Sequence, residues 1–170
     1  ETLENLNEVV AISTNVNLEK KPIFLYKKIQ TVEQNLAAFL KKNNATLINN
    51  VPNDLQIMVI PAYIDSILMN FVTNSVKCKD PKRDPVITLS INRNEQYTIL
   101  SIEDNGLGID LKKYGDKLFG MYKTFHHNSD ARGIGLYISK NQIEAMNGKV
   151  MVCSEVDKGT TFNIYFNEKN

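Results

Sequence analysis

Apolar residues recur at three- and four-residue steps in four stretches of the chain, the spacing that places them on one face of an α-helix. These stretches span residues 3–13, 24–43, 61–78 and 134–146. The first is short and irregular, whereas the other three have clear apolar stripes. Asn147-Gly148 follows the last stretch and is typical of a helix C-cap. The pattern predicts one short helix and three longer helices, each with a buried face.

Apolar and polar residues alternate in other stretches, the period of a half-buried strand. Strands are predicted in two hairpins, over residues 86–92 and 97–103 and over residues 149–156 and 160–166, and in two short runs, residues 46–50 and 57–60. A short helix is expected over residues 110–118, and residues 119–132 show no clear period. Single helices between strands predict an α+β fold, a two-layer sandwich whose mixed, mostly antiparallel sheet is covered on one face by about three helices.

Composition narrows the class of protein. The 170 residues are 42% apolar and 23% charged, as expected for one globular domain, and a chain of this size needs no disulfide to hold its core. The two cysteines form neither a disulfide framework nor a zinc spacing, so a reducing compartment is expected. The net charge of +1 argues against a nucleic-acid binder with a basic surface. The chain opens without an initiator methionine, so we expect a piece of a longer protein.

Three polar residues of the helix at residues 61–78 share one face. Asn70, Asn74 and Lys77 are spaced by four and three, opposite the apolar stripe. Amide oxygens are hard neutral ligands that suit Mg²⁺, and a lysine nearby can hold phosphates. The same spacing also fits an ordinary solvated helix face.

Glycines mark three further segments. Asp104-Asn105-Gly106-Leu107-Gly108 follows a predicted strand, where a carboxylate can accept hydrogen bonds from a ligand or cap its own loop. Arg132-Gly133-Ile134-Gly135-Leu136 begins a helix, which suits an anion site or a flexible helix start. Gly159-Thr160-Thr161-Phe162 fits a hairpin turn followed by a strand.

In this order, the segments resemble the catalytic and ATP-binding domain of bacterial sensor histidine kinases. The N box corresponds to residues 70–78, the first glycine box to 104–108, the phenylalanine box to 118–125, and the second glycine box to 132–136, and a last Gly-Thr pair follows at Gly159-Thr160. The resemblance covers about residues 46–166 and implies the Bergerat ATP-binding fold, with ATP and Mg²⁺ as cofactors.

The resemblance also implies roles for individual residues. Asn74 would coordinate Mg²⁺, Asn70 and Lys77 would reach the phosphates, and Asp104 would accept a hydrogen bond from the adenine amino group. Thr160 would support the adenine end. The other expected ATP-binding residues line the base, the phosphate tail or the lid over residues 111–132: Gly106, Gly108, Ile109, Lys123, Arg132, Gly133, Ile134, Gly135 and Leu136. Either Lys123 or Thr124 would occupy the basic position of the phenylalanine box.

Some residues depart from the family pattern. Cys78 replaces the usual aromatic residue, and Ala131 replaces the first glycine of the second glycine box. The chain's two histidines, His126 and His127, lie in the expected lid and not in a phosphoacceptor motif. The resemblance therefore implies an ATP-binding kinase domain without its own phosphoacceptor, which alone should not autophosphorylate.

Of two other functions of the same fold, one is disfavoured and one stays open. A hydrolysing ATPase would place a glutamate base four residues before the Mg²⁺ asparagine, but that place holds Asn70, and a carboxamide cannot abstract a proton. A nucleotide-sensing or serine-directed kinase module, without histidine autokinase activity, is the alternative function.

The expected organisation of the intact protein follows from the same resemblance. Residues 1–20 would end the dimerisation and phosphoacceptor hairpin, and residues 21–170 would form the ATP-binding domain. The expected partners are that hairpin of the same protein and a response regulator receiver domain, with no nucleic acid. The intact protein would be a homodimer, and this domain cytoplasmic, with membrane tethering of the whole left open.

Overall fold

A computed structural model of the chain describes residues 18–120 and 134–168. The helix predicted over residues 3–13 therefore lies outside the described residues. The main sheet has five strands in the order β2-β4-β5-β7-β6. Its strands are β2 (Thr46–Asn49), β4 (Val86–Arg93), β5 (Tyr97–Asp104), β6 (Lys149–Glu155) and β7 (Gly159–Asn167).

Pairing in this sheet is mixed but mostly antiparallel. Strands β2 and β4 run parallel, whereas β4–β5, β5–β7 and β7–β6 are antiparallel. Both predicted hairpins are confirmed, and Asp157 and Gly159 of the second turn have positive φ angles of 68° and 137°. The last strand of the chain, β7, lies inside the sheet between β5 and β6.

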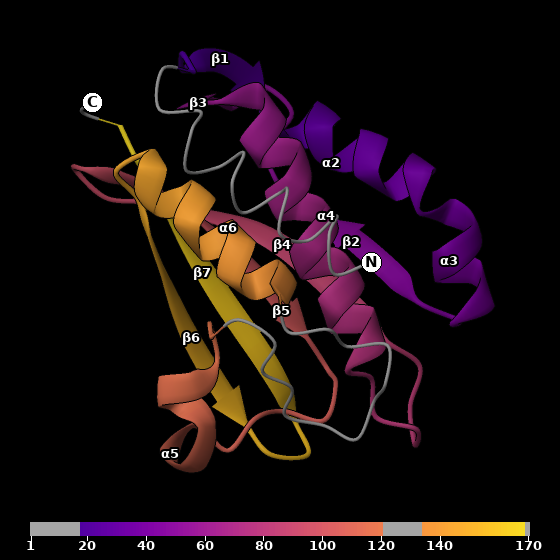
Figure 1. Cartoon of the computed structure of the whole chain (residues 1–170). Coiled ribbons are helices and arrows are strands. Elements are labelled where there is room, and N and C mark those ends of the chain that lie inside the picture. The colour runs from indigo at the N-terminus through magenta and orange to yellow at the C-terminus, as the bar shows by residue number, and fades with distance from the viewer. Residues whose placement is uncertain (1–17, 121–133, 169–170) are drawn as a thin grey trace.

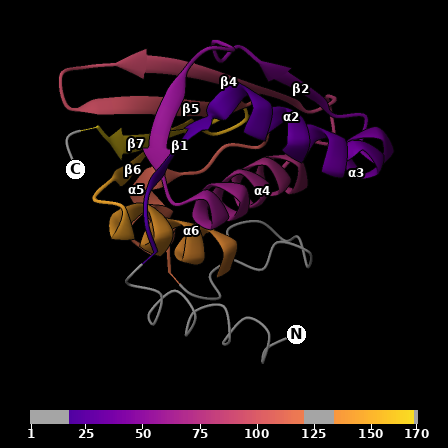
Figure 2. The ribbon, with the colours of Figure 1, turned by 90° about the horizontal axis from the view of Figure 1, so that it is seen from above.

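Helices cover one face of this sheet, as Figures 1 and 2 show. Their bounds are α2 (Leu25–Asn35), α3 (Ala37–Lys42), α4 (Pro61–Lys77) and α6 (Ile134–Ala145). The short α5 (Leu111–Tyr114) and the 3₁₀ turn η1 (Gly115–Lys117) lie near the turn between β6 and β7 (Figure 1). The predicted α+β two-layer sandwich, with one face covered, is confirmed.

Helix α4 forms the centre of the helical layer. Pro61 occupies its first turn, where a missing N–H leaves no hydrogen bond unmade. Its stripe of Ile64, Leu68 and Phe71 is fully buried, and the Phe71 ring meets that of Phe162 on β7 edge-on, with centroids 5.0 Å apart. This packing fixes the polar face of α4 relative to the sheet.

The single helix predicted over residues 24–43 is instead kinked. It is interrupted at Leu36 (φ −98°, ψ 9°), yet Leu36 N–H still bonds Val32 O and Leu40 N–H still bonds Leu36 O. The apolar period therefore continues through the break, which is why the sequence pattern showed one helix.

The segment before the kinked helix also differs from the prediction. Residues Lys21–Phe24 form strand β1, which pairs antiparallel with β3 (Gln56–Val59) in a separate two-stranded ribbon. The first residue predicted as helical, Phe24, thus belongs to a strand. This strand depends on a partner more than thirty residues away and has only four residues, so it left no usable local signal.

Candidate functional site

The polar face of α4 turns toward the start of α6. Asn70 Nδ2 donates to the carbonyl of Gly135 at 3.3 Å and to Ser139 Oγ at 3.1 Å, and a Cβ added at Gly135 would lie 3.5 Å from the Asn70 amide. These bonds fix the orientation of the amide. Its oxygen accepts no hydrogen bond from the described residues and stays available to a ligand.

One turn further along α4, Asn74 presents a second carboxamide. It is half-buried, and its side chain makes no hydrogen bond to the described residues. Two neutral amide oxygens one turn apart, with Lys77 in the next turn, fit a Mg²⁺ ion that takes its remaining ligands from water and phosphate. Among the described residues, no group of three or more His, Cys, Asp or Glu side chains is placed to hold a metal ion.

Asp104 ends strand β5 and is only 8% exposed. Its Oδ1 accepts from the backbone N–H of Gly106 at 2.9 Å and of Thr160 at 3.3 Å, so the carboxylate does cap its own loop. Both backbone bonds go to the same oxygen, and Oδ2 is left for another donor. Capping and ligand binding are therefore compatible roles for this residue.

The surroundings of Asp104 set its protonation. Burial raises the pKa of its carboxyl, and the N–H groups of Gly106 and Thr160 partly oppose that rise. The Ser75 hydroxyl on α4, which lies near the carboxylate, also lowers the pKa of Asp104, by less than the two N–H groups do. Ser75 is 1% exposed, so its hydroxyl is a buried polar group close to the carboxylate.

The glycines of the first glycine box are required by the protein's own packing. A Cβ at Gly106 would lie 2.5 Å from the Cys78 carbonyl, and one at Gly108, where φ is +72°, would lie 2.1 Å from the Glu155 carbonyl. The loop of residues 104–108, called the glycine loop from here on, is thus packed tightly between the end of α4 and the β6–β7 hairpin. The expected contact of Gly106 and Gly108 with the base of ATP remains a prediction.

Thr160 and Asp104 lie in one row across the sheet. Asp104 pairs with Thr160, and Thr160 pairs with Ser154 on β6, so the three residues share the face toward the helices. Ser154 Oγ accepts from Ile109 N–H at 2.7 Å and lies 2.8 Å from Thr160 Oγ1. The sequence analysis did not single out Ser154, although the register of the second hairpin places it opposite Thr160.

Arg83 is a second residue that the sequence analysis missed. Its guanidinium donates to the carbonyls of Asn105 at 2.5 Å, Gly106 at 2.9 Å and Asp157 at 2.5 Å. It also pairs with the buried carboxylate of Asp80 at 3.3 Å. Arg83 therefore joins the glycine loop to the tip of the β6–β7 hairpin, a role without a recognisable sequence spacing.

The remaining predicted site residues fall into three groups. Ile109, Ile134 and Leu136 are buried apolar side chains beside the glycine loop and at the start of α6. Cys78 is a neutral thiol, since burial raises its pKa to about 11, and its carbonyl accepts from Leu107 N–H. Lys123, Arg132 and Gly133, with Thr124, Ala131 and both histidines, lie outside the described residues.

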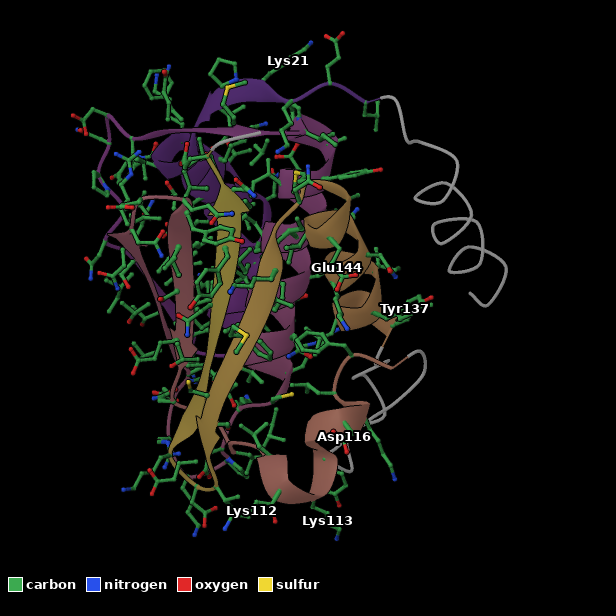
Figure 3. All side chains as sticks on the ribbon, turned by 90° about the vertical axis from the view of Figure 1, so that its left-hand side faces the viewer. Lys21, Lys112, Lys113, Asp116, Tyr137 and Glu144 are labelled. Atoms are coloured by element: carbon green, nitrogen blue, oxygen red, sulfur yellow. The ribbon has the colours of Figure 1, made fainter. Side chains whose placement is uncertain are left out.

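A hollow of about 230 Å³ lies beside the glycine loop. It is lined by residues 107–110, Tyr114 of α5 and Val156-Asp157 of the hairpin. Figure 3 shows Lys112 and Lys113 on α5 at this end of the molecule, and Tyr137 and Glu144 on the side of α6 away from the sheet. None of the described helices is long and apolar enough to cross a bilayer.

Comparison with known proteins identifies a family for most of this domain. The model of the histidine kinase-, DNA gyrase B- and HSP90-like ATPases matches residues 60–170. The chain is 27% identical over 125 residues to the sensor histidine kinase WalK of Bacillus subtilis, covering 71% of this chain and 20% of that protein. It is 28% identical over 170 residues to the autoinducer 2 sensor kinase/phosphatase LuxQ of Vibrio vulnificus, covering 92% of this chain and 20% of that protein.

Solved structures share the fold. The histidine kinase AdeS of Acinetobacter baumannii superposes with a TM-score of 0.81 at 18% identity, covering 99% of this chain and 77% of that chain. The catalytic domain of histidine kinase ThkA superposes with a TM-score of 0.75 at 19% identity, covering 88% of this chain and 96% of that chain. The chain spans about a fifth of the length of the two sequence relatives named above.

Proposed function

Because the chain belongs to the family of histidine kinase-, DNA gyrase B- and HSP90-like ATPases, we propose that it binds Mg²⁺-ATP and transfers the γ-phosphoryl group to a histidine. The histidine would belong to a dimerisation and phosphoacceptor domain outside residues 21–170. One relative named as a sensor histidine kinase and one named as a sensor kinase/phosphatase support this reading over other members of the family.

The observation that carries the proposal is the fixed amide of Asn70. It stands four residues before Asn74, where a hydrolysing relative needs a glutamate base, and its Nδ2 is held by Gly135 and Ser139. A carboxamide cannot take a proton from water, so this site lacks the base that would favour hydrolysis. Phosphoryl transfer to a positioned acceptor depends instead on placement and charge stabilisation.

Each chemical task of this function would fall to a particular residue of the chain. Asn74 Oδ1 would ligate Mg²⁺, with Asn70 Oδ1 reaching the ion's water shell and Lys77 holding phosphate oxygens. When bound, Mg²⁺ supplies positive charge that neutralises the phosphate oxygens. The N-terminal end of α6, a helix of 12 residues, adds backbone N–H groups and a partial positive charge, and Gly135 at this end leaves room beside Asn70.

Asp104 and Thr160, which pair across the sheet, would bind the adenine end of ATP. Asp104 Oδ2 accepts from the exocyclic amino group, while Thr160 supports the same edge of the base. A hydrogen bond to an ionised group is worth about 1.5–3 kcal/mol, which favours adenine over guanine, whose carbonyl would face the carboxylate. Ile109, Gly106 and Gly108 would line the base, and Lys123, Arg132 and Gly133 would close over the phosphates.

The proposal extends to the intact protein. Its partners would be its own phosphoacceptor hairpin, ended by residues 1–20, and a response regulator receiver domain, and it would act as a homodimer. The ATP-binding domain would face the cytoplasm, whether or not the whole protein is tethered to a membrane. No observation favours the alternative of a nucleotide-sensing or serine-directed kinase module.

Two measurements on the chain test this function. Calorimetric titration with ATP should give saturable binding that tightens when Mg²⁺ is added. Incubation with γ-labelled ATP, Mg²⁺ and a separately purified phosphoacceptor hairpin should place acid-labile label on a histidine of the hairpin. If the chain binds ATP but labels no supplied hairpin, and instead labels a serine of a protein substrate, the serine-directed alternative would be favoured.

A further inference from the structure

Ser154 is a hydroxyl with three close neighbours at the adenine end of the site. Its Oγ accepts from Ile109 N–H at 2.7 Å, lies 2.9 Å from the Gly159 carbonyl oxygen and lies 2.8 Å from Thr160 Oγ1. The first neighbour can only donate and the second can only accept. The Thr160 hydroxyl can do either, so its direction is set by the other two contacts.

Counting protons decides that direction. Ser154 has one proton and two lone pairs. If its proton goes to Gly159 O, one lone pair takes Ile109 N–H and the other takes the Thr160 proton, so all three contacts are hydrogen bonds. If the Ser154 proton goes to Thr160 instead, two oxygens with no hydrogen between them are left 2.9 Å apart. The first arrangement satisfies every contact, whereas the second leaves two acceptor oxygens facing each other without a proton between them.

In this arrangement Thr160 has used its only proton. No other hydrogen bond to Thr160 Oγ1 is found among the described residues, so the hydroxyl presents only lone pairs toward a ligand. Thr160 is 6% exposed and its N–H binds Asp104 Oδ1, which places the hydroxyl next to the carboxylate in the same row of the sheet. Carboxylate and hydroxyl together form a pair of hydrogen-bond acceptors.

We propose that Ser154 is a specificity-determining positioning residue, which draws the proton of Thr160 away from the nucleotide and so makes Thr160 an acceptor. The inference rests on the proposed binding of ATP in this site. Two adjacent acceptors suit direct contact with the amino group of adenine and repel a purine that carries a carbonyl at the same position. Ser154 touches no ligand itself and acts through Thr160.

The test compares ATP with ITP, whose base replaces the amino group by a carbonyl. Both affinities are measured by calorimetry for the wild type, Ser154→Ala, Ser154→Thr and Thr160→Val. In Ser154→Ala the Thr160 proton is free to turn toward the carbonyl of ITP. The ratio of ATP to ITP affinity should fall by about threefold to tenfold, the factor that corresponds to one net hydrogen bond. Ser154→Thr keeps a hydroxyl at this position and should keep the wild-type ratio.

Thr160→Val tests independently whether the Thr160 hydroxyl acts as an acceptor or as a donor toward the nucleotide. If Thr160 is an acceptor, removing it relieves the repulsion of the ITP carbonyl and lowers the ratio; if Thr160 is a donor, the ratio rises, and the proposal is overturned. This variant decides the question even where Ser154→Ala fails to fold. In a Thr160→Val background, Ser154→Ala should cause no further change of the ratio, because the hydroxyl through which it acts is gone.

A merely structural role would lower both affinities and leave their ratio unchanged, which would also overturn the proposal. Ser101→Ala is the matched control, since this strand hydroxyl donates to Asn163 Oδ1 at 2.5 Å on the open face of the sheet and should leave the ratio as it is. Wild-type protein that binds neither nucleotide would contradict the proposed function itself. A wild type that binds ATP, with variants whose ratio does not move, would contradict only the role of Ser154.

Discussion

The two oxygens of Asp104 have different environments, which makes this residue a selective target. In Asp104→Asn, the new amide can keep its oxygen toward Gly106 N–H and Thr160 N–H, so the loop retains its cap. The amino group would then replace Oδ2 and face the amino group of adenine, donor against donor. ATP affinity should fall by about tenfold or more, while the urea midpoint changes little. Equal calorimetric affinity in both proteins would show that Asp104 only caps its loop.

The protonation of the same carboxyl predicts opposite pH trends for binding and stability. Burial raises the pKa of folded Asp104, so its contribution to stability is complete below the unfolded pKa of about 3.9 and is lost as pH rises through the folded pKa. The proposed contact with adenine needs the ionised form, so ATP affinity should weaken as pH falls from about 8 to about 5. Titrations of Asp104→Asn over the same range give the background from ATP itself, and an identical pH profile in this variant would contradict the assignment.

ATP binding should respond to the charge of the side chain at position 74 and not only to its shape. Asn74→Asp keeps the size of the side chain but places a negative charge beside the phosphates and removes an amide donor. We expect the dependence of ATP affinity on Mg²⁺ concentration to change, with weaker ATP binding when Mg²⁺ is absent because two negative groups then face each other. Unchanged affinity with and without Mg²⁺ would remove Asn74 from the metal site.

At the scale of elements, the glycine loop is held by close backbone contacts. Gly108→Ala would push a Cβ to 2.1 Å from the Glu155 carbonyl at a positive φ, so the loop and the hairpin must separate. This should cost about 1–3 kcal/mol of unfolding free energy and weaken ATP binding as well. Gly115→Ala is the matched control, because the nearest atom to its Cβ would be 4.0 Å away. Equal urea midpoints for the two variants would contradict the importance of this contact.

Sequence patterns predicted the helices and strands in which apolar residues recur at a regular spacing. The four strands of the two hairpins, the helices α4 and α6, and the turn at Asp157 follow from alternation and turn residues alone. Strand β1 could not be predicted this way because it exists only by pairing with β3. The interruption at Leu36 was hidden because the apolar stripe continues through it.

For the site, sequence analysis found the residues that belong to motifs. Asn70, Asp104 and Thr160 were expected, and the structure brings Asp104 and Thr160 into one hydrogen-bonded row. Arg83 and Ser154 were missed because their partners are backbone groups or hydroxyls on other elements. Such contacts depend on how loops meet in three dimensions, which no spacing along the chain records.

At the scale of the whole molecule, the proposed function would divide the catalytic parts between this domain and an acceptor. Phosphoryl transfer needs the acceptor in line with the γ-phosphate, and tight nucleotide binding cannot replace a missing acceptor. We expect the 170-residue chain to bind Mg²⁺-ATP without stable self-phosphorylation, and transfer to begin when an acceptor hairpin is supplied. Label on a histidine of the chain that vanishes in a His126→Gln, His127→Gln variant would contradict this.

The interior position of β7 has a consequence for the order in which the domain is made. Synthesis proceeds from the N-terminus, yet β5 receives its second neighbour only when residues 159–167 have left the ribosome. Until then β5 is a bare edge with an unpaired row of backbone groups, the kind of surface that associates with other nascent chains. Thr160 arrives on that same strand, so the proposed nucleotide site would be completed only when β7 emerges. On the proposed function, ATP would therefore stabilise the finished domain and would not guide its early folding.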